Sequence, residues 1–372
     1  MKKRVLLALP ALLLAGCAAS SARAEPDGLT VESRYPLAYA QQFTVDECAG
    51  GYSLVTIDTD RYLVVPEGAA VPGGLDADIT VLQQPVRNIY LVSSSAMDPV
   101  ISIGGLDAVA LSGTRAENWY LDAARAAMEN GQIAYAGKYS APDYETILAA
   151  DCGLAIENTM IYHTPEVKEQ LEKFGVPVLV ERSSYESGPL ARMEWVKLYG
   201  ILLGRTAEAE QIFADAEQRI APLAEETPTG KTAAFFSITS NGLATVRKGS
   251  DYVAEMIEMA GAQYAFADLT DGGNNLATIN LSLEDFYAGA EDADVLIYNS
   301  TIEGEVRTLD ELIAKCPLLA DFKAVQSGDV WCTAQSLFQQ SMELPDLILD
   351  MNKVFTEGTP ADSELTFLKH IQ

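Results

Sequence analysis

The sequence predicts an α/β fold of two lobes, each with an open sheet, joined by a single long helix, with a ligand cleft between the lobes. In both halves of the chain, short apolar runs typical of buried parallel strands alternate with helical stretches. A long helical stretch over 188–227 separates the halves. Alternating strands and helices form an open, Rossmann-like sheet, which binds ligands at the carboxyl ends of its strands. Two such sheets therefore leave a cleft between them.

The N-terminus predicts export and lipidation. Cationic residues 2–4 precede an apolar run that ends in Leu-Ala-Gly at 14–16, directly before Cys17. This is the charged start, apolar middle and small-residue cleavage site of a secretory signal. We interpret 1–16 as a lipoprotein signal peptide, and 17–34 as the lipidated Cys17 followed by a flexible tether. An ordinary signal peptide with a chance cysteine is the alternative.

The amino-acid composition argues against a membrane-spanning segment and against nucleic acid as a partner. After residue 20, no segment approaches the ~18–20 apolar residues that span a bilayer. The protein is therefore expected to be anchored to the bacterial membrane by lipid alone, at the cell surface or in the periplasm. The chain has 25 Lys and Arg against 53 Asp and Glu, a net charge of −28. That charge repels a phosphate backbone and argues against nucleic acid as a partner.

The N-terminal lobe is predicted over 35–187. It opens with alternating stretches separated by Gly50-Gly51 and by 58–60, which indicate a small antiparallel meander. The meander strands are 43–45, 52–57 and 61–65, and the buried strands that follow are 88–92, 108–111, 133–135, 154–156 and 176–180. Helices are predicted over 118–130 and 165–174, each followed by a glycine suited to a C-terminal cap.

The bridging helix is predicted over 188–227 as one near-continuous element. Pro189 opens it, and apolar residues at helical spacing follow. Gly204 interrupts the pattern, and Thr206 offers a second N-cap. The C-terminal lobe, 228–372, repeats the alternation. Its strands are predicted over 232–238, 296–299 and 330–332, and a helix over 250–260.

Four cysteines remain besides Cys17. They are Cys48, Cys152, Cys316 and Cys332. Outside the cytoplasm an even number permits two disulfides, and Cys316 with Cys332 is the first pairing to test because both flank one helix–strand unit. Four buried free thiols are the alternative. A zinc site is not predicted, since the chain has no CxxC and only two histidines.

Four stretches, in order and spacing, carry a family resemblance. They are 139–145 leading into 154–157, 187–195 at the start of the bridge, 281–285 leading into 294–297, and 328–331. Together they resemble the substrate-binding lipoproteins of ABC importers for iron chelates, haem and cobalamin. The resemblance covers about residues 35–356 and is more specific for the fold than for the ligand.

The resemblance implies a function. It implies capture of a siderophore, haem or cobalamin in the cleft and delivery to a permease dimer with a cytoplasmic ATPase, without bond chemistry or a cofactor of its own. It also implies that Glu145 and Glu284, one on each lobe, dock on permease arginines, because carboxylate–arginine pairs orient a partner. Otherwise each is a solvated residue at a helix start. A monomer is expected.

Loops at the strand ends supply the ligand-binding candidates. They are Ser95, Met97, Tyr139, Thr159, Met160, His163, Tyr185, Arg247, Lys248, Ser300, Gln335 and Phe338. Aromatic rings there would stack on a flat ligand, and Arg247 and Lys248 would meet ligand carboxylates unless they form a solvated loop pair. With two histidines in all, bare zinc or manganese is not the expected cargo, and His163 is not expected to bind metal.

Two other classes of protein are alternatives to a transport component: an enzyme and a surface-binding lipoprotein. An enzyme is not expected, because the chain lacks a Gly-x-Ser-x-Gly elbow, a Walker A sequence and Gly-x-Gly-x-x-Gly. The alternative function is a surface haem- or chelate-binding lipoprotein that does not dock on a permease. Charge reversal at Glu145 and Glu284 separates it from a transport component, which would lose uptake and keep ligand affinity.

Overall fold

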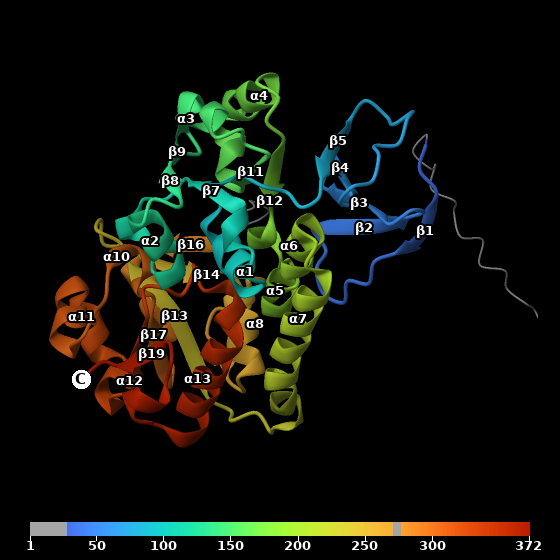
Figure 1. The fold of residues 1–372 in the computed structure, drawn as a ribbon. Helices are drawn as coiled ribbons and strands as arrows, with labels where there is room; N and C mark the ends of the chain where they lie inside the picture. Colours follow the sequence, from blue (N-terminus) through green and yellow to red (C-terminus); the bar gives the residue numbers. More distant parts are fainter. Residues whose placement is uncertain (1–27, 271–276) are drawn as a thin grey trace, which may run out of the picture.

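The computed structural model describes residues 28–270 and 277–372 and contains an additional sheet beside two α/β lobes (Figure 1). The signal peptide and the lipidation predicted at Cys17 lie outside the described residues. No helix in the described ranges is long and apolar enough to cross a bilayer.

The first sheet is a five-stranded unit at the side of the N-terminal lobe (Figure 1). Its strands are β1 (Val31–Arg34), β2 (Phe43–Cys48), β3 (Tyr52–Ile57), β4 (Asp60–Val65) and β5 (Ile79–Gln83). Strands β1 to β4 pair antiparallel in sequence order, which confirms the predicted meander, and β5 joins β4 in parallel. One face of the sheet, including Phe43, Val45 and Tyr62, is buried in the main core of the molecule.

The N-terminal lobe is built on a parallel sheet with the order β12-β11-β6-β7-β8. Its strands are β6 (Ile89–Leu91), β7 (Val109–Ser112), β8 (Ala134–Tyr135), β11 (Leu154–Asn158) and β12 (Val178–Glu181). A small hairpin, β9 (Gly137–Lys138) and β10 (Ala141–Pro142), lies before α3. The chain runs outward from β6 to β8 on one side and from β11 to β12 on the other. The topological switch point therefore lies between β6 and β11, where ligands of open sheets bind.

Helices cover both faces of this sheet. They are α1 (Met97–Ser102), α2 (Asp122–Glu129), α3 (Tyr144–Ala149) and α4 (Pro165–Lys173). Residues of α1 and α2 pack in the main core with Leu154 and Ile156 of β11, while α3 and α4 cover the other face in a separate apolar cluster. The side chains of a strand alternate between faces, so β11 contributes to both clusters.

The bridge differs from the single long helix that the sequence predicted. It consists of α5 (Pro189–Met193), α6 (Val196–Leu203) and α7 (Thr206–Ile220). Gly204 is left-handed at φ 68°, which ends α6, and the chain reverses into α7. A Cβ at Gly200 would lie 2.6 Å from the Cβ of Ala209, so only glycine permits this close approach of α6 and α7. The element that joins the lobes is therefore α7, which runs along the side of both (Figure 1).

The C-terminal lobe has a mixed sheet with the order β16-β14-β13-β17-β18-β19, and β15 pairs with β13. Its strands are β13 (Thr232–Ile238), β14 (Ala244–Arg247), β15 (Gln263–Tyr264), β16 (Thr278–Leu281), β17 (Val295–Tyr298), β18 (Val330–Thr333) and β19 (Leu368–His370). Its helices are α8 (Tyr252–Met259), α9 (Leu283–Ala290), α10 (Ser300–Glu303), α11 (Leu309–Lys315), α12 (Lys323–Ser327) and α13 (Leu344–Glu357). Strands β13, β17 and β18 are parallel, and all of their residues except Thr232 are buried.

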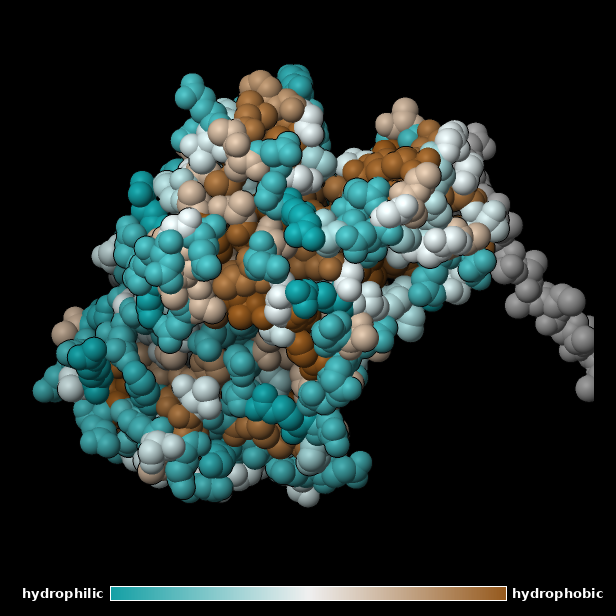
Figure 2. Space-filling view, viewed as in Figure 1, coloured by the Kyte–Doolittle hydropathy of each residue, from teal (hydrophilic) through white to brown (hydrophobic). Residues whose placement is uncertain are grey.

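Hydrophilic residues cover most of the C-terminal lobe in the face shown in Figure 2, and hydrophobic residues gather in the middle, around α1 and α6. This distribution fits one continuous core that spans the lobes and α7. The two lobes and the first sheet therefore share buried surface, and the cleft is a feature of one compact body.

Candidate ligand cleft

The carboxyl ends of the two main sheets face each other. Ser95, which follows β6, accepts a hydrogen bond at its carbonyl oxygen from the hydroxyl of Ser341 at 3.0 Å. Ser341 begins a short 3-10 turn, Ser341–Glu343, that follows β18 and precedes α13. Beside it, Asp98 of α1 accepts a bond from the Met342 amide at 2.7 Å. Burial raises the pKa of Asp98 to about 6. These contacts show that the two strand-end regions meet across the lobes.

A buried carboxylate lies beside this contact on the N-terminal lobe. Glu181 ends β12, and its Oε2 accepts hydrogen bonds from the hydroxyls of Ser93 and Ser95, each at 2.9 Å. The amide of Ser183 donates to Oε1 at 2.6 Å. Ser95, a predicted ligand contact, is half-buried and lies at the switch point, yet its hydroxyl is already engaged by Glu181.

Four exposed apolar or aromatic side chains lie in segments that follow strands: Tyr120, Met160, Tyr162 and Ile302, which we call the apolar rim. Each follows the carboxyl end of a strand, namely β7 for Tyr120, β11 for Met160 and Tyr162, and β17 for Ile302. Ile302 is 72% exposed, more than any other large hydrophobic side chain in the described ranges. Exposed apolar groups that cluster at strand ends indicate a binding surface.

A polar latch joins the lobes next to this rim. The side-chain amide of Gln339 accepts a hydrogen bond from the Tyr120 amide and donates one to the Asn118 carbonyl oxygen, both at 2.8 Å. The Tyr120 hydroxyl donates to Oε1 of Gln335 at 3.1 Å. Gln335, a predicted ligand contact, is therefore part of the contact between lobes. We call this group, Asn118, Tyr120, Gln335 and Gln339, the latch.

A cavity of about 400 Å³ lies between the lobes. The N-terminal half of the chain contributes Gln42, Arg182, Ser184, Tyr185, Glu186 and Ser187, and the C-terminal lobe contributes Lys248, Ser250, Asp251 and Ala277. Two predicted ligand contacts, Tyr185 and Lys248, thus line one cavity from opposite lobes. The guanidinium carbon of Arg182 lies 5.0 Å from the centre of the Tyr185 ring, within reach of a cation–π contact.

Arg247, unlike Lys248, does not line this cavity. It is buried, its guanidinium carbon lies 4.9 Å from the ring centre of Phe338, and its Nη1 lies 3.6 Å from Oδ2 of Asp251. Burial raises the pKa of Asp251, and the Arg247 charge opposes that rise. Phe338, half-buried, therefore covers Arg247, and both differ from the free, ligand-facing groups that the sequence predicted.

Two candidates are corrected by burial. Met97 is fully buried in the main core, because it begins α1 and points under the sheet. Ser300 is also fully buried: its amide donates to the Thr333 hydroxyl at 3.1 Å, and its hydroxyl donates to the Thr333 carbonyl at 2.5 Å. Neither side chain has a surface to offer a ligand, and Ser300 instead ties the ends of β17 and β18 together.

The remaining candidates follow β8 or β11. Thr159 and Tyr139 are half-buried, and Tyr139 packs against the cluster under α3 and α4. His163 is exposed at the end of a 3-10 turn, Thr159–His163. No group of three or more potential metal-ligating side chains exists within the described ranges.

The two predicted docking residues are exposed. Glu145 lies in the first turn of α3, and Glu284 in the first turn of α9. The N-cap side chain of each helix, Asp143 or Ser282, accepts a bond from the amide three residues on. Both glutamates thus lie at capped helix starts.

The disulfide predicted first is absent. Cys316 and Cys332 are both buried free thiols. Cys316 caps the end of α11, whereas Cys332 lies within β18, where its thiol contacts the Thr333 carbonyl at 3.6 Å. Burial raises the pKa of Cys332, which keeps it a thiol.

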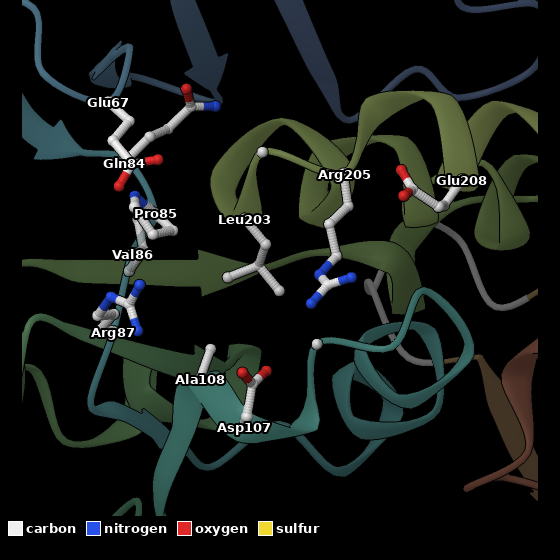
Figure 3. Close-up of a pocket in the computed structure, with 12 residues that line it drawn as sticks. Glu67, Gln84, Pro85, Val86, Arg87, Asp107, Ala108, Leu203, Arg205 and Glu208 are labelled. Carbon is white, nitrogen blue, oxygen red and sulfur yellow. The ribbon is translucent and has the colours of Figure 1, made fainter.

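Another hollow, of about 460 Å³, lies away from the cleft (Figure 3). Arg87 precedes β6 and Asp107 precedes β7, so this hollow is at the amino ends of the strands. Arg205, at the corner between α6 and α7, points into it (Figure 3). Open α/β sheets bind ligands at the opposite edge, and the cleft is therefore the stronger candidate.

Sequence reasoning missed several cleft residues. Tyr120, Tyr162, Ile302, Arg182 and Gln339 were not among the candidates. Tyr162, Ile302 and Arg182 lie within a few residues of the ends of predicted strands, which is the signal that could have identified them. Tyr120 lies within the helix predicted over 118–130, and it meets Gln339 only because the lobes face each other. Arg182 follows the strand predicted over 176–180 and could have been found by the same rule.

Comparison with known proteins agrees with this geometry. A family model described as periplasmic binding protein matches residues 92–336. An uncharacterized lipoprotein of Methanocaldococcus jannaschii is 23% identical over 290 residues, which cover 74% of this chain and 67% of the relative. Family and relative together indicate a location outside the cytoplasm.

Solved structures share the fold. A periplasmic heme binding protein from Pseudomonas aeruginosa has a TM-score of 0.56 at 20% identity, covering 74% of this chain and 94% of its own. An ABC-type Fe3+-hydroxamate transport protein from Saccharomonospora viridis gives 0.56 at 20%, covering 73% and 93%. A periplasmic vitamin B12 binding protein of Vibrio cholerae gives 0.51 at 16%, covering 73% and 99%. With the family model matched across both lobes, the chain belongs to the periplasmic binding protein family, a class of solute-binding proteins.

Proposed function

We propose that this protein captures a metal chelate or macrocycle, such as a ferric siderophore, haem or a cobalamin, in the inter-lobe cleft and delivers it to an ABC permease. The observation that carries this proposal is the cavity that both lobes line, together with exposed apolar side chains that follow strands, one of which, Tyr162, contacts Arg182 of the lining. Two tyrosines and two aliphatic side chains left exposed there suit a large, partly flat organic ligand.

The absence of a metal-ligating cluster among the described residues separates this cargo from a bare ion. Zinc or manganese would need several histidine or carboxylate ligands around one point. The structural neighbours named for heme, Fe3+-hydroxamate and vitamin B12 support the same ligand class. The protein would then act by binding alone, as a monomer without a cofactor of its own.

Delivery is proposed to use Glu145 and Glu284. Each is exposed at a capped helix start, one per lobe, so a two-subunit permease could bind both through arginines. Lipid on Cys17 would keep the protein at the membrane, and a cytoplasmic ATPase would drive release. A surface lipoprotein that binds a chelate without docking is the alternative, and uptake assays on the two glutamates separate the two.

Thermal unfolding against a panel of ferric siderophores, haem and cobalamins tests the binding function. A ligand at 100 times its dissociation constant should add about 2.7 kcal/mol to the free energy of unfolding and raise Tm. One responding member would define the substrate class. No response from any member, at concentrations that bind known chelate carriers, would contradict the proposal.

A further inference from the structure

We propose that the first sheet, β1–β5, is part of the ligand-binding site, and that its Asp58 is a positioning residue that orients Arg182 toward an anionic group of the ligand. The sheet precedes residues 92–336, which the family model matches. The inference rests on the proposed function, because it needs a ligand in the cleft.

The contact between sheet and cleft is direct. Asp58 lies in the turn between β3 and β4 with a left-handed φ of 54°, a conformation that Asp tolerates better than most residues. Its Oδ2 lies 2.7 Å from Nη1 of Arg182, which follows the last residue of β12. The same Nη1 lies 3.4 Å from the hydroxyl of Tyr162 in the apolar rim. Asp58 therefore fixes one end of the Arg182 guanidinium at the edge of the cavity.

The rest of that guanidinium is left for another partner. Its hydrogen bonds within the described ranges all involve Nη1, and its Nε is buried without a partner among those residues. One face lies over Tyr185, which restricts the side chain further. A planar cation held in this way is suited to a carboxylate, because two parallel N–H groups match two oxygens.

The sheet reaches the cavity at a second point. Residues 38–42, the strap between β1 and β2, end at Gln42, which lines the cavity. Glu186, also in the lining, accepts bonds from the amides of Gln41 and Gln42 at 3.0 and 2.9 Å. The wall of the cavity on this side is therefore made jointly by the first sheet and the N-terminal lobe.

The cavity lining has a cation from each lobe, and its two carboxylates, Glu186 and Asp251, are engaged by backbone amides of the strap and by Arg247. Arg182 lines the cavity from one lobe and Lys248 from the other, in a chain of net charge −28. A ligand with two carboxylates would meet a cation on each side. Such a ligand is attracted by both lobes at once, so its binding favours their closed arrangement.

The same hairpin supplies a matched control. Asp60 begins β4, two residues from Asp58, and its Oδ2 lies 2.7 Å from Nζ of Lys168 in α4. This ion pair also fastens the first sheet to the N-terminal lobe, but neither partner lines the cavity. Asp58→Asn and Asp60→Asn therefore remove equivalent ion pairs, of which only one touches Arg182.

The test titrates the full-length protein in detergent with haem and with haem dimethyl ester, which lacks the free carboxylates. We expect Asp58→Asn to weaken haem binding by about three- to tenfold, Arg182→Gln by about tenfold or more, and Asp60→Asn to leave it unchanged. Binding of the ester should be the same in all four proteins. Equal effects of Asp58→Asn and Asp60→Asn, or an equal loss for haem and ester, would overturn the inference.

A ligand-free measurement separates this inference from the proposed function. NMR relaxation of the Arg182 Nε–Hε group should show increased mobility in Asp58→Asn and none in Asp60→Asn. If wild-type protein binds no member of the chelate panel, the proposed function fails on its own account. If Arg182 is equally rigid in Asp58→Asn, the positioning role is wrong whether or not a chelate binds.

Discussion

Glu145 and Glu284 occupy the same position in helices of different lobes. Each is exposed and is the second residue of its helix. In both helices the N-cap side chain accepts a hydrogen bond from the backbone amide of the third helix residue. The positive end of each helix dipole favours a carboxylate there. The two lobes thus present the same local structure to a partner that would contact both.

Charge reversal at this pair is expected to abolish transport without affecting capture. Glu145→Lys and Glu284→Lys should each lower chelate uptake by about tenfold or more, because each removes charge-assisted hydrogen bonds worth about 1.5–3 kcal/mol. Ligand affinity in solution should stay at the wild-type value. Glu166→Lys is the matched control, since Glu166 is the exposed second residue of α4. Equal uptake by wild type and the double variant would show that these residues do not dock.

Glu157 should make stability fall as pH rises. It lies in β11, fully buried, and neither carboxyl oxygen has a hydrogen-bond partner among the described residues. Burial raises its pKa from 4.5 to about 8. The folded state therefore holds a proton that the unfolded state releases above pH 4.5, so stability declines through the window from pH 4.5 to 8.

The variant Glu157→Leu should lack the part of the decline in stability with pH that deprotonation of Glu157 causes. Its free energy of unfolding relative to wild type should increase with pH across that window, by on the order of 1 kcal/mol per pH unit. Urea unfolding at pH 5, 7 and 9 measures the difference, and subtraction of the two proteins removes the contribution of other acids. A difference that does not change with pH would contradict the assignment.

The latch is expected to hold the lobes together. Gln339→Ala removes both bonds to the loop at Asn118 and Tyr120, so an open arrangement should become more populated. Small-angle scattering of the ligand-free protein should give a larger radius of gyration. Gln340→Ala changes a half-buried neighbour with no side-chain bond in the described ranges and should have no effect. Identical scattering curves for all three proteins would show that the latch is dispensable.

The strap over residues 38–42 should contribute strongly to stability. Glu194 is fully buried and accepts bonds from the amides of Ala38, Tyr39 and Ala40, each at 2.8 Å, and from Lys197 at 2.7 Å. Glu194→Ala leaves these donors without an acceptor and should lower the free energy of unfolding by about 3–5 kcal/mol. Urea unfolding checks this, with the exposed Glu208→Ala as the control. A loss below about 1 kcal/mol would mean that water replaces the carboxylate.

Local patterns predicted much of the fold. Alternation of apolar runs and helical stretches predicted both α/β lobes, and the paired glycines 50–51 predicted the turn of the meander. The bridge was predicted less well. From the sequence, Gly204 is expected to interrupt one continuous helix, whereas in the structure the chain reverses direction there, between α6 and α7. Its left-handed conformation and the contact of Gly200 with Ala209 depend on how two helices pack, which no local pattern contains.

The site shows the same limit. The sequence predicts that loops after strands border the cleft, yet the positions of their side chains depend on partners far away. Ser300 is buried by Thr333, and Tyr120 meets Gln339, 219 residues away. Asp58 reaches Arg182 across 124 residues. Tertiary packing brings such distant residues together, so the sequence alone indicates candidate residues but not which of them meet in the folded protein.

A chelate bound between the lobes should shield the cleft segments from solvent. Hydrogen–deuterium exchange of the protein, with and without the chelate that raises its Tm, measures this shielding. Binding in the cleft should slow exchange at the strand ends, in residues 118–120, 159–163, 182–187 and 335–341, and should cause no change around Arg87 and Arg205 in the hollow of Figure 3. Protection confined to that hollow, with none in the cleft segments, would show that the chelate does not bind between the lobes.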